Sequence, residues 1–176
     1  MLLALLIALA VVLRGLEELI PNPLPWVRIG LANMMTLLAM LLFGVKSGFL
    51  LTVLRVLVAS LLFGTFLSPT FVLSFTAGML STVVMGFTYT YFHKIFSPIG
   101  ISVLGGFTHN LVQLVVAYFL IVKHVQIFYL FPILSLIGIA SGCLNGWIVE
   151  VLYKHIISQM SSLLSQTQME HDKKLA

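Results

Sequence analysis

Residues 27–64 read VRIGLANMMTLLAMLLFGVKSGFLLTVLRVLVASLLFG and hold two almost uninterrupted apolar runs. The runs cover 27–44 and 46–64, and the glycine-flanked turn between them contains Lys46. Each run has close to the roughly 20 residues that an α-helix needs to cross the hydrocarbon core of a bilayer. We therefore predict two transmembrane helices joined by a tight turn.

The rest of the chain continues this pattern. Its 176 residues are 60% hydrophobic and 8% charged, with a mean hydropathy of +1.14, whereas soluble domains average about 25% charged residues. Four further apolar runs, each bounded by proline, glycine or charge, cover residues 1–20, 70–92, 98–122 and 127–152. We predict an all-α membrane protein that consists of one bundle of about six transmembrane helices in residues 1–153.

The basic residues indicate how the bundle is oriented. With both termini inside, five lysines fall on the inner side and two basic residues on the outer side, and this excess is the bias that sets membrane topology. The inner set is Lys46, Lys94, Lys154, Lys173 and Lys174, and the outer set is Arg28 and Lys123. The prediction is therefore N-in and C-in, with residues 154–176 as a cytoplasmic polar tail. Apolar residues from Ile156 to Leu164 recur there at helical spacing, which fits either a short interfacial helix or a frayed tail.

Composition also excludes several classes of function. The net charge of +4 is scattered through apolar sequence and forms no basic patch, so we expect no nucleic-acid partner. The single cysteine, Cys143, excludes a disulfide within the chain. His124 and His155 lie too far apart in the predicted topology to share a metal ion, so we expect no metal and no cofactor.

Small residues at four-residue spacing mark two helix faces. Gly138, Gly142 and Gly146 form a flat stripe on the sixth predicted helix, and Ala4 and Ala8 form a smaller one on the first. Such stripes allow a neighbouring backbone to approach closely. For the glycines, packing inside the bundle and a dimer seam are the two interpretations.

Ionisable side chains inside a membrane cost about 2.5–3.5 kcal/mol each even on the lenient insertion scale, so each needs a partner or a function. Arg14 precedes Glu17 and Glu18 by three and four residues, which places opposite charges on one helix face. The structural interpretation is a self-neutralising pair, and the functional one is contact with a ligand.

Arg55 lies mid-span with no acidic residue in its own helix. Its planar, permanently charged fork suits phosphate or carboxylate, so an anionic ligand competes with a structural bond to Glu17 or Glu18.

A second polar group lies in the fifth predicted span. His109 and Gln113 are one helical turn apart and Asn110 adjoins them. Asn33, in the outer half of the second span, is placed to face the same region. These four residues predict a polar pocket for a small molecule, with an interhelical hydrogen-bond network as the competing interpretation. Asn145, beside the glycine stripe, is interpreted as a hydrogen-bonding contact between helices.

Several segments together resemble the Gx transporter family, which is often labelled heptaprenyl diphosphate synthase component I. They are Gly30–Asn33, Leu54–Leu57 followed by Ser60–Gly64, Ser97–Gly100 and His109–Gln113. The family is related to the substrate-binding (S) components of energy-coupling factor transporters. The resemblance implies a six-helix bundle in a bacterial plasma membrane with an outward-facing ligand pocket. It also implies that Ala4 and Ala8 dock on a transmembrane coupling subunit that works with separate ATPases.

The synthase label itself is not matched by the residues that such chemistry needs. Prenyl chain elongation holds magnesium on diphosphate through aspartate-rich clusters, and this chain has one aspartate, Asp172, in its polar tail. It also has no glycine-rich nucleotide-binding loop with lysine. We therefore expect no enzyme activity.

The leading hypothesis is a subunit that captures a small anionic or amphipathic metabolite, such as an isoprenoid or quinone precursor, a flavin or another vitamin-like compound. The alternative is a membrane anchor or scaffold in a prenyl, quinone or flavin-linked redox assembly.

Overall fold

The computed structural model describes residues 2–19 and 30–175, with side chains up to residue 162, and this part of the chain contains helices and no strand. Six α-helices follow one another, which confirms the predicted all-α bundle. They are α1 (Leu2–Leu19), α2 (Leu31–Phe43), α3 (Val45–Leu62), α4 (Pro69–Phe92), α5 (Pro98–Ala117) and α6 (Phe131–Leu175). A π-helical turn η1 (Tyr118–Val122) and a 3₁₀ helix η2 (Val125–Leu130) join α5 to α6.

Four segments of the described chain are long and apolar enough to cross a membrane. They are Val45–Leu62, Pro69–Phe92, Pro98–Val122 and Val125–Ser162. The spans predicted over 46–64, 70–92 and 98–122 agree with three of them within a few residues. The molecule is therefore a multi-pass membrane protein.

The predicted second span is shorter in the structure than expected. Helix α2 has 13 residues, or about 20 Å at 1.5 Å per residue, against a hydrocarbon core of about 30 Å. Its first residue is Leu31 rather than residue 27, and Arg28 lies outside the described residues. The run from Ala32 to Met40 is buried throughout, because α2 is surrounded by α1, α3, α5 and α6 rather than by lipid. The apolar run therefore indicates a central core helix.

Serine–proline pairs begin two of the long helices. The Ser68 hydroxyl accepts a hydrogen bond from the Phe71 N–H, and the Ser97 hydroxyl accepts one from the Gly100 N–H. The proline that follows each serine occupies the first helical position, where its missing N–H costs nothing. These local signals explain why the ends of the predicted turns at 68–69 and 97–98 agree with the structure.

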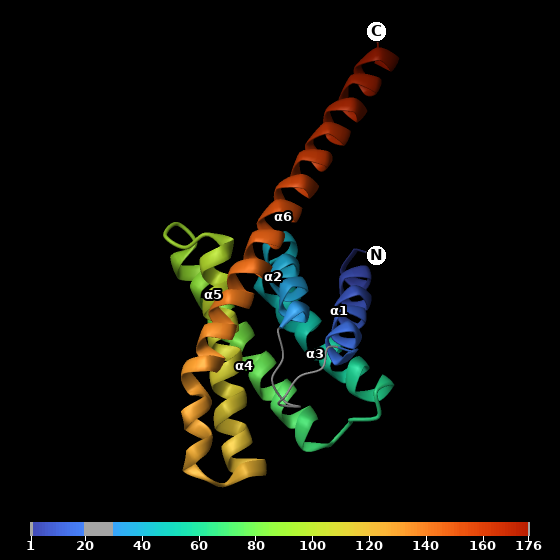
Figure 1. Cartoon of the computed structure of the whole chain (residues 1–176). Helices are drawn as coiled ribbons and strands as arrows, with labels where there is room; N and C mark the ends of the chain where they lie inside the picture. Colours follow the sequence, from blue (N-terminus) through green and yellow to red (C-terminus); the bar gives the residue numbers. More distant parts are fainter. Residues whose placement is uncertain (1, 20–29, 176) are drawn as a thin grey trace.

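The helices run alternately up and down, so that turns collect at two ends of the bundle. In Figure 1 the start of α1, the α2–α3 turn, the α4–α5 turn and the exit of α6 lie at one end. The α3–α4 turn and the α5–α6 connection lie at the other. Lys46, Lys94 and Lys154 thus share the end that carries both termini, while Lys123 lies at the opposite end. This separation is what the orientation prediction requires of the fold.

The predicted end of the sixth helix near residue 152 is wrong. Helix α6 continues without a break from Phe131 to Leu175 and projects beyond the other helices (Figure 1). No glycine or proline follows Gly146 to interrupt it. Lys154 Nζ and Glu150 Oε1 add an i,i+4 ion pair at 2.7 Å across the predicted boundary at 153. The tail is therefore an extension of α6 along its own axis rather than a separate short helix.

The glycine stripe lies in the interface between α5 and α6. A Cβ on Gly142 would come within 2.6 Å of Val103 Cα, and one on Gly146 within 2.6 Å of Ile99 Cα. A Cβ on Gly138 would meet the Gly106 carbonyl oxygen at 2.9 Å. The two backbones are thus in direct contact along the stripe. The structure places the stripe inside one chain, where no second copy can reach it.

Candidate ligand-binding pocket

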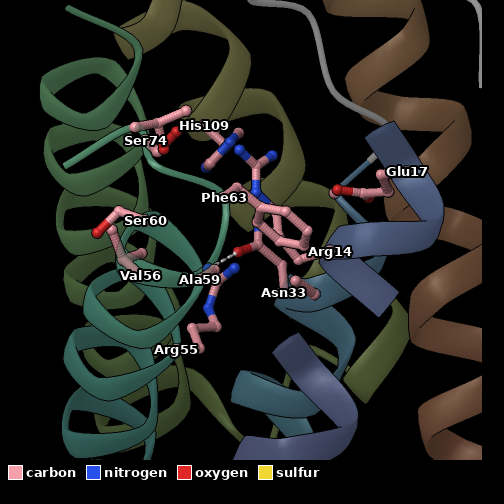
Figure 2. Close-up of a pocket in the computed structure, with 13 residues that line it drawn as sticks. Arg14, Glu17, Asn33, Arg55, Val56, Ala59, Ser60, Phe63, Ser74 and His109 are labelled. Atoms are coloured by element: carbon pink, nitrogen blue, oxygen red, sulfur yellow. Dashed lines mark hydrogen bonds between the residues drawn. The ribbon is translucent and has the colours of Figure 1, made fainter. Parts of the chain in front are cut away.

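A pocket opens among α1 to α5 at the end of the bundle opposite the termini. Its empty space is about 550 Å³ when the open mouth is counted. Five of the seven predicted binding residues line it and come from four different helices (Figure 2). They are Arg14, Glu17, Asn33, Arg55 and His109. The structure thus brings together side chains that are up to 95 positions apart, since the set runs from residue 14 to residue 109.

Arg55 is the most costly residue in this pocket. Its side chain is 7% exposed, and its Nη2 donates a hydrogen bond to Asn33 Oδ1 at 2.5 Å. Figure 2 shows this bond from α3 to α2 as a dashed line. The Arg55 Nε is buried and has no hydrogen-bond partner among the described residues. A neutral amide satisfies one donor but carries no charge, and Glu17 offsets the Arg55 charge only from another part of the pocket wall. Part of the hydrogen-bonding capacity of the guanidinium is therefore unused.

The two glutamates of α1 have different roles, which helical spacing alone does not distinguish. Arg14 Nη2 pairs with Glu18 Oε1 at 3.2 Å, as predicted for an i,i+4 pair. Glu17 is 6% exposed, and its carboxylate accepts a hydrogen bond from the backbone N–H of Leu31. Leu31 is the first residue of α2, where unpaired N–H groups and the helix dipole favour a negative charge. Glu17 therefore caps α2 and fixes the end of α1 beside it.

His109 and its neighbours divide between two faces of α5. Within the described chain, the buried His109 Nδ1 has no hydrogen-bond partner, and the same holds for Gln113 Nε2 one turn later. Asn110 faces α6, where its Nδ2 donates to the Leu134 carbonyl oxygen at 2.9 Å. Gln113 lines neither this pocket nor the smaller pocket in which Asn110 lies. Of the predicted polar group on α5, His109 alone reaches the Arg55 pocket.

The remaining wall of the pocket is apolar or hydroxylic and lies outside the sequence prediction. Its members include Val56, Ala59 and Ser60 of α3, Phe63 directly after α3, and Ser74 of α4, which lies beside His109 (Figure 2). The first four follow Arg55 at one, four, five and eight residues, which is one face of a helix. That spacing is a signal that could have identified them, once Arg55 was assigned to the pocket. The site therefore combines a cationic group with an apolar wall.

The predicted docking face of α1 lies on the outside of the bundle. Ala4 and Ala8 are exposed, and Leu5, Leu9 and Val12 beside them are exposed as well. A surface of this composition faces lipid or another membrane protein. In the described residues, no three histidine, cysteine, aspartate or glutamate side chains gather as metal ligands would.

One comparison with known proteins gives a match. A sequence-family model described as heptaprenyl diphosphate synthase component I matches residues 6–152. No curated protein and no solved structure matches the chain. The matched region contains every residue that lines the pocket and ends one residue before Tyr153, close to where α6 leaves the bundle.

Proposed function

Because the chain belongs to the heptaprenyl diphosphate synthase component I family, named for one component of a larger assembly, we propose that it is a membrane subunit that binds a ligand and depends on partner subunits. Its task is to capture a small anionic or amphipathic metabolite in the Arg55 pocket. Candidate ligands are isoprenoid or quinone precursors, flavins and other vitamin-like compounds.

The observation that supports this proposal is the incomplete hydrogen bonding of the buried Arg55 side chain. A charged group that serves only the fold is normally paired, because removing it from water costs several kcal/mol. Here the partner is the neutral Asn33 amide, one guanidinium nitrogen has no partner in the described chain, and the group lines a cavity. Glu17 offsets part of the Arg55 charge from another part of the wall. An anion in the pocket would contact the guanidinium directly and accept the unused hydrogen bond.

The apolar wall sets the second property of the ligand. Val56, Ala59 and Phe63 lie beside the cationic group, so a molecule with an anionic end and an apolar body matches both parts. The pocket opens at the end of the bundle opposite the termini. With both termini in the cytoplasm, it takes its ligand from outside the cell membrane.

The energy for transport has to come from other chains, and we propose no enzyme activity for this one. The single aspartate lies in the tail, and no glycine-rich loop for nucleotide is present in the sequence. In the proposed assembly, a transmembrane coupling subunit docks on the exposed Ala4 and Ala8 face of α1, and separate ATPases hydrolyse ATP. This arrangement is that of an energy-coupling-factor transporter.

The test is retention of a small molecule by protein purified in mild detergent, read by mass spectrometry of the extracted ligand. Arg55→Met should lose the molecule and should melt at the same or a higher temperature, because a buried charge without a full partner has been removed. Lys154→Met, which removes an exposed cation, is the matched control and should retain it. Retention at the wild-type level by Arg55→Met would contradict the proposal, and so would a wild-type protein with no small molecule.

A second candidate function rests on the extension of α6. A helix that projects beyond the bundle is a natural attachment for a soluble partner, and the family name is that of a synthase component. In this version the chain is the membrane anchor of a prenyl, quinone or flavin-linked assembly. Truncation after Tyr153 should then abolish co-purification of a soluble synthase while the bundle still folds. Unchanged co-purification would exclude α6 as the attachment.

A further inference from the structure

A second, smaller pocket lies between α2, α5 and α6, next to the Arg55 pocket. Its empty space is about 250 Å³ when the open mouth is counted. The two pockets share Gly30, Asn33 and His109, so they are adjacent spaces with a common wall. We call the smaller space the inner pocket and the Arg55 pocket the outer pocket. The polar side chains around the inner pocket are Asn33, Ser102, His109, Asn110, Ser141 and Asn145. Each of these side chains is more than nine-tenths buried.

The inner pocket differs from the outer one in chemistry. Of the described residues, no arginine, lysine, aspartate or glutamate lines it, whereas Arg14, Glu17 and Arg55 line the outer one. Its walls are amides, hydroxyls and an imidazole contributed by three helices. Such polar side chains bind uncharged groups through directed hydrogen bonds.

The hydrogen bonding of these side chains is incomplete. Asn145 Nδ2 donates to the Gly30 carbonyl oxygen at 3.1 Å, but the Asn145 Oδ1 is buried without a partner in the part of the chain that the structure describes. His109 Nδ1, on the wall shared with the outer pocket, is likewise buried without a hydrogen-bond partner in the described residues. Ser141 donates its hydrogen to the Gly138 carbonyl oxygen at 3.2 Å, so its oxygen can still accept a hydrogen bond. Buried polar atoms without partners are rare in folded proteins, so these atoms around one cavity can bind either water or a hydrogen-bonding group of a ligand.

We propose that the inner pocket is a second subsite, which binds an uncharged hydrogen-bonding group of the same ligand whose anionic group meets Arg55. This inference rests on the proposed function. Asn145 Oδ1 accepts a hydrogen bond from a hydroxyl, amide or ring N–H of the ligand, and Ser141 and His109 complete the subsite. The ligand is then polar at both ends, and a phosphate or diphosphate attached only to hydrocarbon would leave the inner atoms unpaired.

Two probes of similar size separate the subsites. Benzyl phosphate carries a phosphate on a hydrocarbon ring, and pyridoxine 5′-phosphate carries a phosphate on a ring with hydroxyl groups and a nitrogen. We expect the wild-type protein, freed of bound ligand, to bind pyridoxine 5′-phosphate about tenfold more tightly than benzyl phosphate, the effect of one or two additional hydrogen bonds. Binding is measured by titration calorimetry in detergent.

Variants assign the preference to the inner pocket. Asn145→Leu and Ser141→Ala should each bring the affinity for pyridoxine 5′-phosphate close to that for benzyl phosphate, without changing the affinity for benzyl phosphate. Ser141→Ala keeps the test valid if loss of the Asn145–Gly30 bond impairs folding. Thr88→Val is the matched control, because the Thr88 hydroxyl is buried, bonds to Val84 of its own helix and lines neither pocket. It should keep the tenfold preference.

The possible outcomes distinguish this inference from the function on which it rests. Equal affinity of the wild-type protein for the two probes would overturn the inner subsite and leave the Arg55 site standing; the inner pocket would then hold only water. A preference that survives both Asn145→Leu and Ser141→Ala would also overturn it. Failure of both probes to bind at millimolar concentration would contradict the anion site itself.

Discussion

At the scale of single residues, two buried charges in the same pocket, Glu17 and Arg55, differ in the groups that they contact. Glu17 has a defined structural partner, the N-terminus of α2, while Arg55 has a neutral amide. Both line the same pocket, 6% and 7% exposed. The difference therefore lies in what each group contacts rather than in how deeply it is buried.

Glu17 should be a stabilising residue. Glu17→Ala removes the carboxylate that caps α2 and should lower the free energy of unfolding by about 1–2 kcal/mol, the usual effect of losing a helix cap. Glu150→Ala, which removes an exposed i,i+4 pair with Lys154, should cost at most about 0.5 kcal/mol. Denaturant or thermal unfolding in detergent measures both. Equal effects of the two substitutions would mean that the Glu17–Leu31 bond is not formed in solution.

The sequence predicts which residues belong to the site better than it predicts toward which neighbouring helix each side chain points. Arg55, Asn33 and His109 can be assigned to a pocket because polar side chains in apolar helices need partners. His109 and Asn110 are adjacent in sequence, yet only His109 also lines the Arg55 pocket while Asn110 bonds to α6. Spacing within one helix does not say which neighbouring helix each side chain meets. Asn145 does join two helices, as its sequence position predicts. Its place in the inner pocket depends on the crossing of α6 over the start of α2, which no local pattern encodes.

At the scale of helices, hydroxyl groups join three core segments. Thr52 of α3 bonds to Thr36 of α2 at 3.1 Å and to Thr82 of α4 at 2.9 Å, and all three are fully buried. Thr82 donates its hydrogen to the Gly78 carbonyl oxygen, so Thr52 donates to Thr82 and Thr36 donates to Thr52. The chain of hydroxyls is satisfied and holds α3 one turn before Arg55.

Thr52→Val tests this chain with almost no change in shape. It leaves Thr36 without an acceptor and Thr82 without a donor, so we expect a loss of about 1–3 kcal/mol in the free energy of unfolding. Thr76→Val is the control, because the Thr76 hydroxyl bonds within its own helix, and it should cost less than about 0.5 kcal/mol. A thermal shift measured in one detergent compares the two. A neutral Thr52→Val would show that packing alone joins these helices.

The glycine stripe gives a second prediction about helix contacts. Gly142→Ala would place a methyl group 2.6 Å from Val103 Cα and force α5 and α6 apart, with an expected cost of about 2–4 kcal/mol. Gly15→Ala is the contrasting case. Its nearest neighbour, at 3.0 Å, is the flexible end of the Phe63 ring, and alanine favours a helix. Gly15→Ala should therefore be neutral or stabilising, and equal losses for the two variants in thermal unfolding would contradict the direct backbone contact between α5 and α6.

The first and last residues of a helix can be predicted where a local sequence signal marks them. The Ser68–Pro69 and Ser97–Pro98 pairs determine the starts of α4 and α5. The apolar run that forms α2 carries no sign that it is short and central, since an apolar residue faces lipid or protein with equal ease. The drop in hydropathy after Tyr153 suggests the end of a helix, yet α6 continues. Polar side chains indicate that this part of the helix is surrounded by water, but they do not interrupt its backbone hydrogen bonds.

At the scale of the whole molecule, the two ends of the bundle differ in charge and in access. Lys46, Lys94, Lys154, Lys173 and Lys174 lie at the end with the termini, and the Arg55 pocket opens at the other. The positive-inside bias predicts that the pocket lies on the outer face of the membrane.

Cysteine labelling of intact cells tests this orientation. In a Cys143→Ser background, Lys123→Cys should react with a membrane-impermeant maleimide from outside. Lys46→Cys and Lys94→Cys should react only after the cells are opened. The reverse pattern would place the pocket on the inner face and contradict capture from outside, although it would leave the fold unchanged.

The continuity of α6 gives the molecule a mechanical property. Asn145 on the floor of the inner pocket and the projecting segment 153–175 belong to one unbroken helix. The 30 residues that follow Asn145, up to Leu175, correspond to about 45 Å of helix. A tilt of about 10° at Asn145 would displace the far tip by about 8 Å. Because one continuous helix joins the inner pocket to the projecting segment, we expect any tilt of α6 at the pocket to move that segment as well.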